Sequence, residues 1–166
     1  MPYEFKMTRR VEFADTDMAG MLHFTNFFRY MEEAEHAFYR SLGFSVHVPM
    51  CQGSIGWPRV HAACDYVKPL RFEDEVEIHL LVRCKKMRSI AYMCVFRKIA
   101  KTGSPEIEPV ARGSMTVVCT TMANDREGLK TISIPSGISD KIEESPTDVL
   151  DRSVAAQSHS REDDRS

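Results

Sequence analysis

Residues 24–42, FTNFFRYMEEAEHAFYRSL, decide the fold of this chain. Their apolar side chains recur every three or four positions, which is the spacing of one face of an α-helix: Phe24, Phe27, Phe28, Met31, Ala34, Phe38 and Leu42. Thr25 and Asn26 suit the start of a helix, and Gly43 suits its end. We therefore expect one long helix of about sixteen residues, roughly 24 Å in length, with one side buried.

The segments on both sides of this helix alternate apolar and polar residues, as strands do. One such segment, residues 3–14, precedes the helix, and a loop at residues 43–56 follows it. Four more segments with strand character come next, at residues 60–67, 76–84, 88–100 and 110–122. A strand, a long helix and then several strands without intervening helices predict an α+β fold, in which an antiparallel sheet of five or six strands wraps around the helix.

Length and composition favour a single domain. The chain has 166 residues, of which 43% are hydrophobic, enough for one core. Its 22 basic and 24 acidic residues give a formal net charge of −2, which argues against a nucleic acid or an anionic membrane as a partner. The first residues contain no continuous apolar run, so we expect a cytoplasmic protein.

The cysteines and the end of the chain indicate no further structural element. The five cysteines are odd in number, widely spaced and free of any C-x-x-C pair, so we expect reduced thiols. Residues 143–166 contain few large apolar residues and no sustained period. We therefore assign residues 1–142 to the domain and expect a disordered polar tail after it, in which Val149 and Leu150 are too few to dock a helix.

The stretch that joins the first strand to the helix can carry chemistry. Asp17 lies there, and a carboxylate near a helix N-terminus stays ionised at neutral pH, so it can act as a nucleophile or a general base. Gly20 permits a tight bend toward the helix start, whose unpaired N–H groups can stabilise an oxyanion. The same residues also fit a turn and a cap, with Asp15 as a turn acceptor.

Residues 11–32, VEFADTDMAGMLHFTNFFRYME, resemble the signature of the 4-hydroxybenzoyl-CoA thioesterase-like hotdog family. Asp17, Gly20, Asn26 and Phe27 fall at matching positions, and a weaker likeness extends over about residues 3–122. The resemblance implies a hotdog fold, assembled into homodimers or homotetramers with active sites at the subunit interface. It also implies hydrolysis of an acyl-CoA to free acid and CoA, without a metal or redox cofactor.

By this likeness Asp17 is the catalytic carboxylate, and the backbone N–H of Phe24 binds the thioester carbonyl. His23 is either a partly buried ring satisfied by the backbone or an orienting contact to substrate or to Asp17. Asp15, Asp17 and His23 lack a fourth ligand for a metal, so we expect none.

A basic cluster follows the second strand after the helix, formed by Arg83, Lys85, Lys86 and Arg88. It is either a solvated hairpin end or a site for the phosphates of CoA, since Lys and Arg donate charge-assisted hydrogen bonds to phosphate. Lys86 and Arg88 are the candidate phosphate contacts.

Three other functions remain open. A non-catalytic acyl-CoA binding or sensing module would have the same pocket, with Asp17 as a cap only. A hotdog dehydratase or hydratase would by resemblance need a His and Glu pair, of which His23 offers half. Another thioesterase branch uses a glutamate on the central helix, for which Glu32, Glu33 and Glu35 are available.

Overall fold

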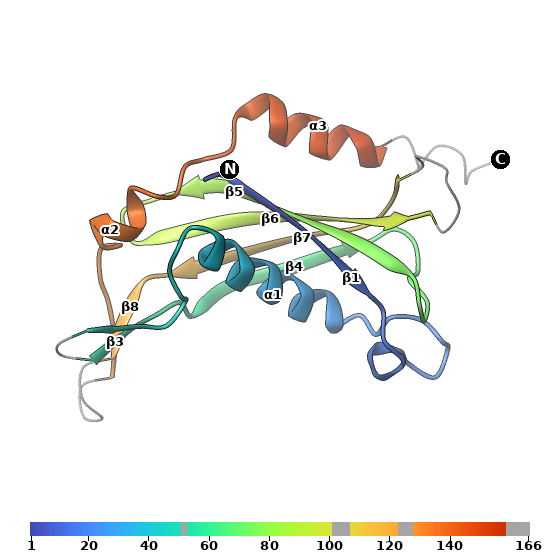
Figure 1. Ribbon diagram of the computed structural model, residues 1–166, viewed down its shortest axis with the longest axis horizontal. Coiled ribbons are helices and arrows are strands. Elements are labelled where there is room, and N and C mark those ends of the chain that lie inside the picture. The colour runs from blue at the N-terminus through green and yellow to red at the C-terminus, as the bar shows by residue number, and fades with distance from the viewer. Residues whose placement is uncertain (51–52, 101–106, 123–127, 159–166) are drawn as a thin grey trace.

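The computed structural model describes residues 1–50, 53–100, 107–122 and 128–158. Its main sheet is antiparallel, with five strands in the order β1-β5-β6-β7-β4. The bounds of these strands are Glu4–Arg10 for β1, Arg59–Tyr66 for β4, Glu75–Lys85 for β5, Ser89–Ile99 for β6 and Ile107–Val118 for β7. One long helix, α1 (Asn26–Ser41), packs against one face of this sheet (Figure 1). The predicted α+β fold is confirmed.

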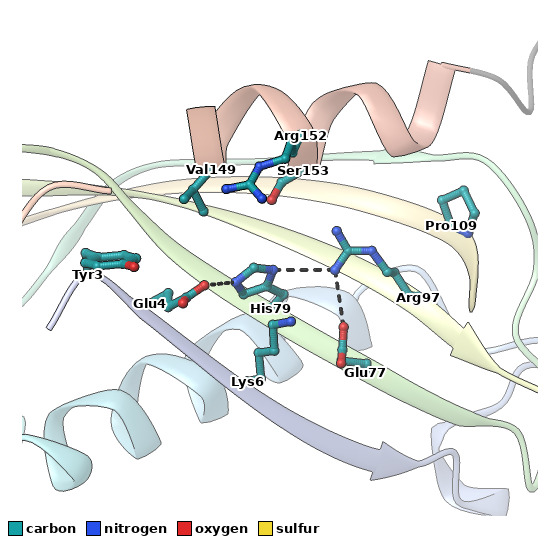
Figure 2. A pocket seen from close by; sticks show the side chains of 10 residues that line it. All are labelled: Tyr3, Glu4, Lys6, Glu77, His79, Arg97, Pro109, Val149, Arg152 and Ser153. Carbon is teal, nitrogen blue, oxygen red and sulfur yellow. Dashed lines mark hydrogen bonds and ion pairs between the residues drawn. The ribbon is translucent and has the colours of Figure 1, made fainter. Parts of the chain in front are cut away.

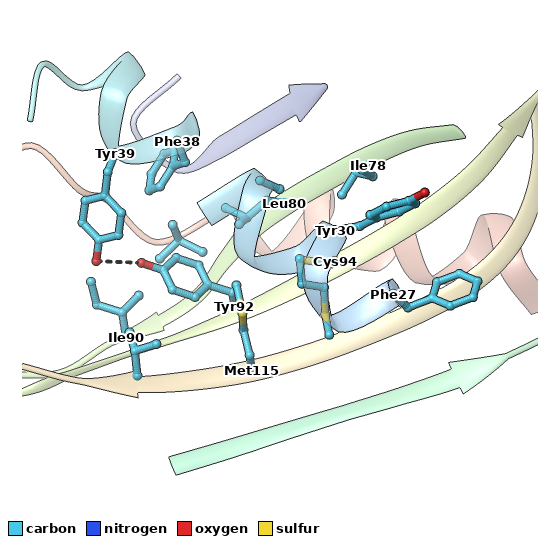
Figure 3. Close-up of a cluster of buried hydrophobic side chains, with 14 of the residues drawn as sticks. Phe27, Tyr30, Phe38, Tyr39, Ile78, Leu80, Ile90, Tyr92, Cys94 and Met115 are labelled. Carbon is cyan, nitrogen blue, oxygen red and sulfur yellow. Dashed lines mark hydrogen bonds between the residues drawn. The ribbon is translucent and has the colours of Figure 1, made fainter. Parts of the chain in front are cut away.

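Helix α1 has the sixteen residues that the apolar spacing predicts. Its buried face meets the inward side chains of β5 and β6, including Ile78, Leu80 and Tyr92 (Figure 3). Burial of each large apolar side chain of this kind contributes about 1.5–3 kcal/mol, so this contact contributes strongly to the stability of the domain. Gly43 follows the helix with φ +86°, as a left-handed stop requires, whereas the Thr25 side chain makes no capping hydrogen bond.

A second, smaller sheet lies beside the end of α1 and corrects the expectation of a plain loop at residues 43–56. Its order is β2-β3-β8-β9, with bounds Val48–Met50, Gly53–Gly56, Thr120–Met122 and Leu129–Thr131. These strands have three or four residues each, too few to show a period in the sequence.

The expected tail also differs from the structure, because residues 147–158 form a helix. The short helix α2 (Ser136–Ser139) leads to α3 (Thr147–Ser158), which lies on the face of the main sheet opposite α1 (Figure 1). Val149 and Leu150 do dock this helix, since they pack against three outward-facing apolar side chains of β5 and β6: Leu81, Met93 and Val95. Residues 159–166 lie outside the described ranges.

Two general expectations can be compared with the described residues. The four cysteines among them, Cys64, Cys84, Cys94 and Cys119, are free thiols, and Cys51 lies outside the described ranges. None of the helices in those ranges has both the length and the apolar character needed to cross a membrane.

Candidate active site

The loop between β1 and α1 closes into a tight hairpin at Asp17. The Asp17 N–H donates to the Met21 carbonyl at 2.8 Å, and the Gly20 N–H donates to the Asp17 carbonyl at 3.0 Å. Gly20 has φ +71°, a left-handed conformation that favours glycine, so the predicted bend is confirmed. The Leu22 N–H donates to the Leu70 carbonyl at 2.7 Å and so ties the hairpin to the segment before β5.

The two oxygens of the Asp17 carboxylate have different environments. Oδ1 accepts hydrogen bonds from the Ala19 N–H at 2.8 Å and from the Met21 N–H at 3.2 Å, as in an Asx turn. Within the described ranges Oδ2 accepts none, and the side chain is half-buried. The turn therefore fixes the direction of the carboxylate and leaves one oxygen available for chemistry.

Asp15 anchors this loop to helix α1. The residue ends a short 3-10 helix, η1 (Phe13–Asp15), and is only 3% exposed. Its Oδ2 accepts a hydrogen bond from the Tyr30 hydroxyl at 2.8 Å. Its backbone carbonyl accepts from the His23 N–H at 2.9 Å and from the Asn26 side-chain amide at 2.8 Å. The loop is thus held from both the side chain and the backbone of one residue.

Two arginines balance the charge of the buried Asp15 carboxylate. The nearest nitrogens of Arg9 and Arg29 lie 3.9 and 3.8 Å from its oxygens. Desolvation and the adjacent carboxylate raise the pKa of Tyr30, so its hydroxyl stays a proton donor to Asp15. The sequence did not predict this anchoring role for Asp15, because nothing in its spacing shows that Tyr30 points back toward it.

Phe24 lies two residues before α1, with its backbone N–H unengaged by any acceptor among the described residues. Its carbonyl accepts a hydrogen bond from the Tyr66 hydroxyl at 3.2 Å, which joins the end of β4 to the start of the helix. Sequence reasoning missed Tyr66, which is 42 positions away and belongs to no local pattern. This free N–H belongs to a peptide group next to the N-terminus of α1, which is the positive end of the helix dipole.

His23 contacts its own neighbours. Its Nδ1 is 2.7 Å from the Thr25 hydroxyl, and its ring stacks on Phe24 with centroids 4.7 Å apart. No hydrogen bond joins His23 to Asp17 among the described residues.

The three helix glutamates all pair with arginines. Glu33 lies 2.5 Å from Arg9, and Glu32 lies 3.3 Å from Arg59. Glu35 is 1% exposed and accepts from Arg59 at 2.6 Å, but its other oxygen is buried without a hydrogen bond in the described part of the chain. Burial raises the pKa of Glu35 to about 7.

The structure does not bring the basic cluster together or near Asp17 within one chain. Lys86 and Arg88 are exposed at the β5–β6 hairpin. The Asp17 hairpin is bonded instead to the segment before β5, so the length of β5, roughly 33 Å at about 3.3 Å per residue, separates the two places. Lys85 instead donates to two backbone carbonyls of the C-terminal segment, at 2.8 and 2.6 Å. Arg83 lines a hollow beside α3.

No His, Cys, Asp or Glu side chains in the described ranges gather into a group that could hold a metal ion.

An antiparallel sheet packed on one long helix, with a carboxylate loop before that helix, defines a hotdog-fold protein. The chain belongs to the thioesterase-like superfamily, whose family model matches residues 11–149. Similar structures include a gentisyl-coenzyme A thioesterase, with a TM-score of 0.68 and 30% identity over 84% of this chain and 100% of that one.

Two further comparisons involve CoA thioesters of aromatic acids. A mutant 4-hydroxybenzoyl-CoA thioesterase complexed with 4-hydroxybenzoyl-CoA has a TM-score of 0.72 at 21% identity, over 85% of this chain and 99% of that one. A 1,4-dihydroxy-2-naphthoyl-CoA hydrolase of Synechococcus sp. is 33% identical over 82 residues, which cover 45% of this chain and 54% of that one. Matches to the first curated relatives span 54 to 60% of their lengths.

Proposed function

We propose that this protein is an acyl-CoA thioesterase that hydrolyses an aromatic acyl-CoA to the free acid and CoA. One observation carries the proposal: in the loop before α1, no described residue donates to Oδ2 of Asp17 and none accepts from the backbone N–H of Phe24. The first can act on a thioester carbon, and the second can bind the thioester oxygen. The Asp15 anchor keeps the two groups on one rigid segment.

In the proposed reaction, the thioester carbonyl accepts a hydrogen bond from the Phe24 N–H. Negative charge develops on this oxygen in the transition state, where the donor and the helix dipole stabilise it most. Oδ2 of Asp17 either attacks the carbonyl carbon, forming an anhydride and expelling the CoA thiolate, or takes a proton from an attacking water. In the first route a water then hydrolyses the anhydride, which releases the free acid and restores the Asp17 carboxylate, and the CoA thiolate takes up a proton from solvent. In the second route the water adds to the carbonyl carbon and the CoA thiolate leaves with the proton that Asp17 has taken. Both routes consume one water and end in the free acid and CoA.

The aromatic acyl group is proposed from the relatives. Their names specify gentisyl, 4-hydroxybenzoyl and 1,4-dihydroxy-2-naphthoyl thioesters, all of which are hydroxylated aromatic acids. The gentisyl enzyme supports the proposal most, since it matches over its whole length at 30% identity.

The proposed active form is a homodimer, or a homotetramer built from such dimers, in which β4 pairs with β4 of a second copy. β4 is an edge strand, and all its side chains except Cys64 are exposed. Long exposed edge strands favour pairing with another chain. An antiparallel pairing reverses the second sheet, so the hairpin with Lys86 and Arg88 of one copy comes to the same end as Asp17 of the other. There these residues can bind CoA phosphates.

The proposal is tested by incubating the purified protein with CoA thioesters of benzoic, hydroxybenzoic, short-chain and long-chain acids and following release of free thiol. We expect turnover of hydroxybenzoyl-CoA, with kcat/KM at least tenfold above that of the aliphatic thioesters. Tight binding of every thioester without thiol release would contradict the proposal and indicate a binding or sensing module. Preference for an aliphatic thioester would contradict only the aromatic assignment.

A further inference from the structure

A cavity that is open to solvent and lined by both polar and apolar groups lies between α3 and the face of the sheet that points away from α1. Its volume is about 500 Å³, within the roughly 300–1,000 Å³ typical of small-molecule sites. The floor is made of side chains from β1, β5 and β6, and the roof is made of Val149, Arg152 and Ser153 of α3 (Figure 2). The main sheet separates this cavity from helix α1 and its core (Figure 1).

A chain of hydrogen-bonded polar side chains crosses the floor. Glu4 lies 2.7 Å from Nε2 of His79, Nδ1 of His79 lies 3.4 Å from Arg97, and Arg97 lies 3.2 Å from Glu77. A guanidinium can only donate, so Nδ1 of His79 accepts and its Nε2–H donates to Glu4. Burial lowers the pKa of His79, which agrees with a neutral ring. Both floor carboxylates therefore already have a donor.

Two cationic donors of the floor remain after these bonds are counted, whereas the roof cation, Arg152, is paired with Asp148 through Nε and one terminal nitrogen. No hydrogen bond or ion pair in the described ranges engages the Lys6 ammonium, and only one terminal nitrogen of Arg97 is bonded. The second terminal nitrogen of Arg97 points toward α3 in Figure 2. The Arg97 side chain is only 13% exposed, so its unengaged nitrogens lie in a partly dry site where a charge-assisted hydrogen bond is strong.

We propose that this cavity binds a small organic carboxylate, held by Lys6 and Arg97 and covered by α3. A planar carboxylate matches the edge of a guanidinium. A monoanion also suits this lining better than a phosphate dianion, because Glu4 and Glu77 would repel two charges more strongly. Val149 on the roof offers an apolar contact for the rest of the acid.

The ligand would also fasten α3 to the sheet. Among the described residues of this helix, Val149 and Leu150 pack on the apolar cluster of the sheet, so a molecule in contact with both roof and floor adds to the stability of the docked helix. Hydrogen exchange in residues 147–155 should therefore slow when the cavity is filled. The proposal is independent of the thioesterase function, since none of its residues touches the Asp17 loop.

The test measures hydrogen exchange of the full chain, with benzoate as the probe and benzamide as its uncharged analogue. Benzoate should slow exchange in residues 147–155, and benzamide should bind there at least tenfold more weakly. Lys6→Ala and Arg97→Gln should each raise the Kd for this effect at least tenfold, since each removes a charged partner of the carboxylate. Arg10 lies on the same strand but outside the cavity, so Arg10→Ala should leave the Kd of benzoate unchanged.

Lys6→Ala keeps the test valid if Arg97→Gln does not fold, because the exposed Lys6 side chain supports no other residue by a hydrogen bond or ion pair in the described ranges. Three results would overturn the proposal: no protection of α3 by benzoate up to about 10 mM, equal protection by benzamide, or unchanged affinity in Lys6→Ala. Thioester hydrolysis by the same samples is measured separately, so failure of the cavity and failure of the thioesterase assignment can be told apart.

Discussion

Two aspartates of one loop, Asp15 and Asp17, have opposite environments. Asp15 is buried, its Oδ2 accepts a hydrogen bond from Tyr30, and its carbonyl accepts one from Asn26, so it fastens the loop to α1. Asp17 is half-buried and has an oxygen without a donor in the described ranges. This arrangement lets Asp15 hold the loop rigid and leaves Asp17 available for reaction. It explains why the D-x-D spacing fits a turn and a catalytic site equally well.

Removal of the Tyr30 hydroxyl should destabilise the protein. Tyr30→Phe leaves the buried Asp15 carboxylate without its shortest hydrogen bond, which costs about 1–3 kcal/mol of unfolding free energy. Urea denaturation followed by circular dichroism measures the change. The control is Tyr66→Phe, whose hydroxyl is exposed and whose loss should change stability by less than about 0.5 kcal/mol. Equal stability of Tyr30→Phe and wild type would contradict the anchoring role of Asp15.

Glu35 should make stability depend on pH. Its pKa is raised to about 7 in the folded protein from an ordinary value of 4.5, mainly by burial. The folded state therefore holds a proton that the unfolded state has already lost, and the free energy of unfolding falls as pH rises from 4.5 to about 7. Glu35→Gln carries no such proton, so its stability relative to wild type should increase across this window.

Urea unfolding at several pH values in this window checks the Glu35 prediction, with the exposed glutamate variant Glu143→Gln as the control. A stability difference between Glu35→Gln and wild type that stays constant with pH would show that Arg59 keeps Glu35 ionised instead.

The sequence predicted some of the site residues and missed others for a physical reason. Asp17, Gly20 and Phe24 lie within eight positions of one another, so a local pattern contains them. Tyr30 and Tyr66 act through contacts across 15 and 42 positions, and such contacts exist only after the chain has folded. The proposed CoA contacts of Lys86 and Arg88 depend on a second copy, which no single sequence displays.

Among the elements, α1 and β7 approach each other unusually closely at Gly113. A Cβ built at this position would lie 2.2 Å from the sulfur of the buried Met31 side chain, so alanine fits only if the end of that side chain moves within the core. Gly113→Ala should cost about 1–3 kcal/mol of stability by overpacking. Thermal and urea unfolding measure this loss, and Gly137→Ala, which meets nothing within 4 Å, is the matched control. Equal effects of the two variants would contradict the tight packing of α1 on the sheet.

Long elements were predictable, and short or weakly docked ones were not. Helix α1 and strands β5 to β7 have eleven or more residues each, so their periods are visible in the sequence. Strands β2, β3 and β8 are too short for that. The sequence did contain one signal for α3. Leu81 is an apolar residue on the outward face of β5, and a buried apolar side chain there requires another element to pack over it.

For the molecule as a whole, the exposed β4 edge predicts association. Val60 on this strand is 64% exposed, and Val60→Lys should place a charge in the proposed interface, shifting the protein toward monomers and lowering thioester hydrolysis with it. Analytical ultracentrifugation measures the molecular mass. Leu129→Lys, on another exposed strand, should leave the mass unchanged. A wild-type protein that is monomeric and fully active would contradict the two-copy site.

The most direct test of the account is the hydrolysis of hydroxybenzoyl-CoA by Asp17→Asn. Asparagine keeps the shape of the turn but lacks the anionic oxygen, so kcat should fall by about 100-fold or more. Binding of the uncleaved thioester should stay within about threefold of wild type, and the surface variant Asp140→Asn should be fully active. Full activity in Asp17→Asn would contradict the central claim, and loss of activity in Glu35→Gln alone would move the chemistry to the helix.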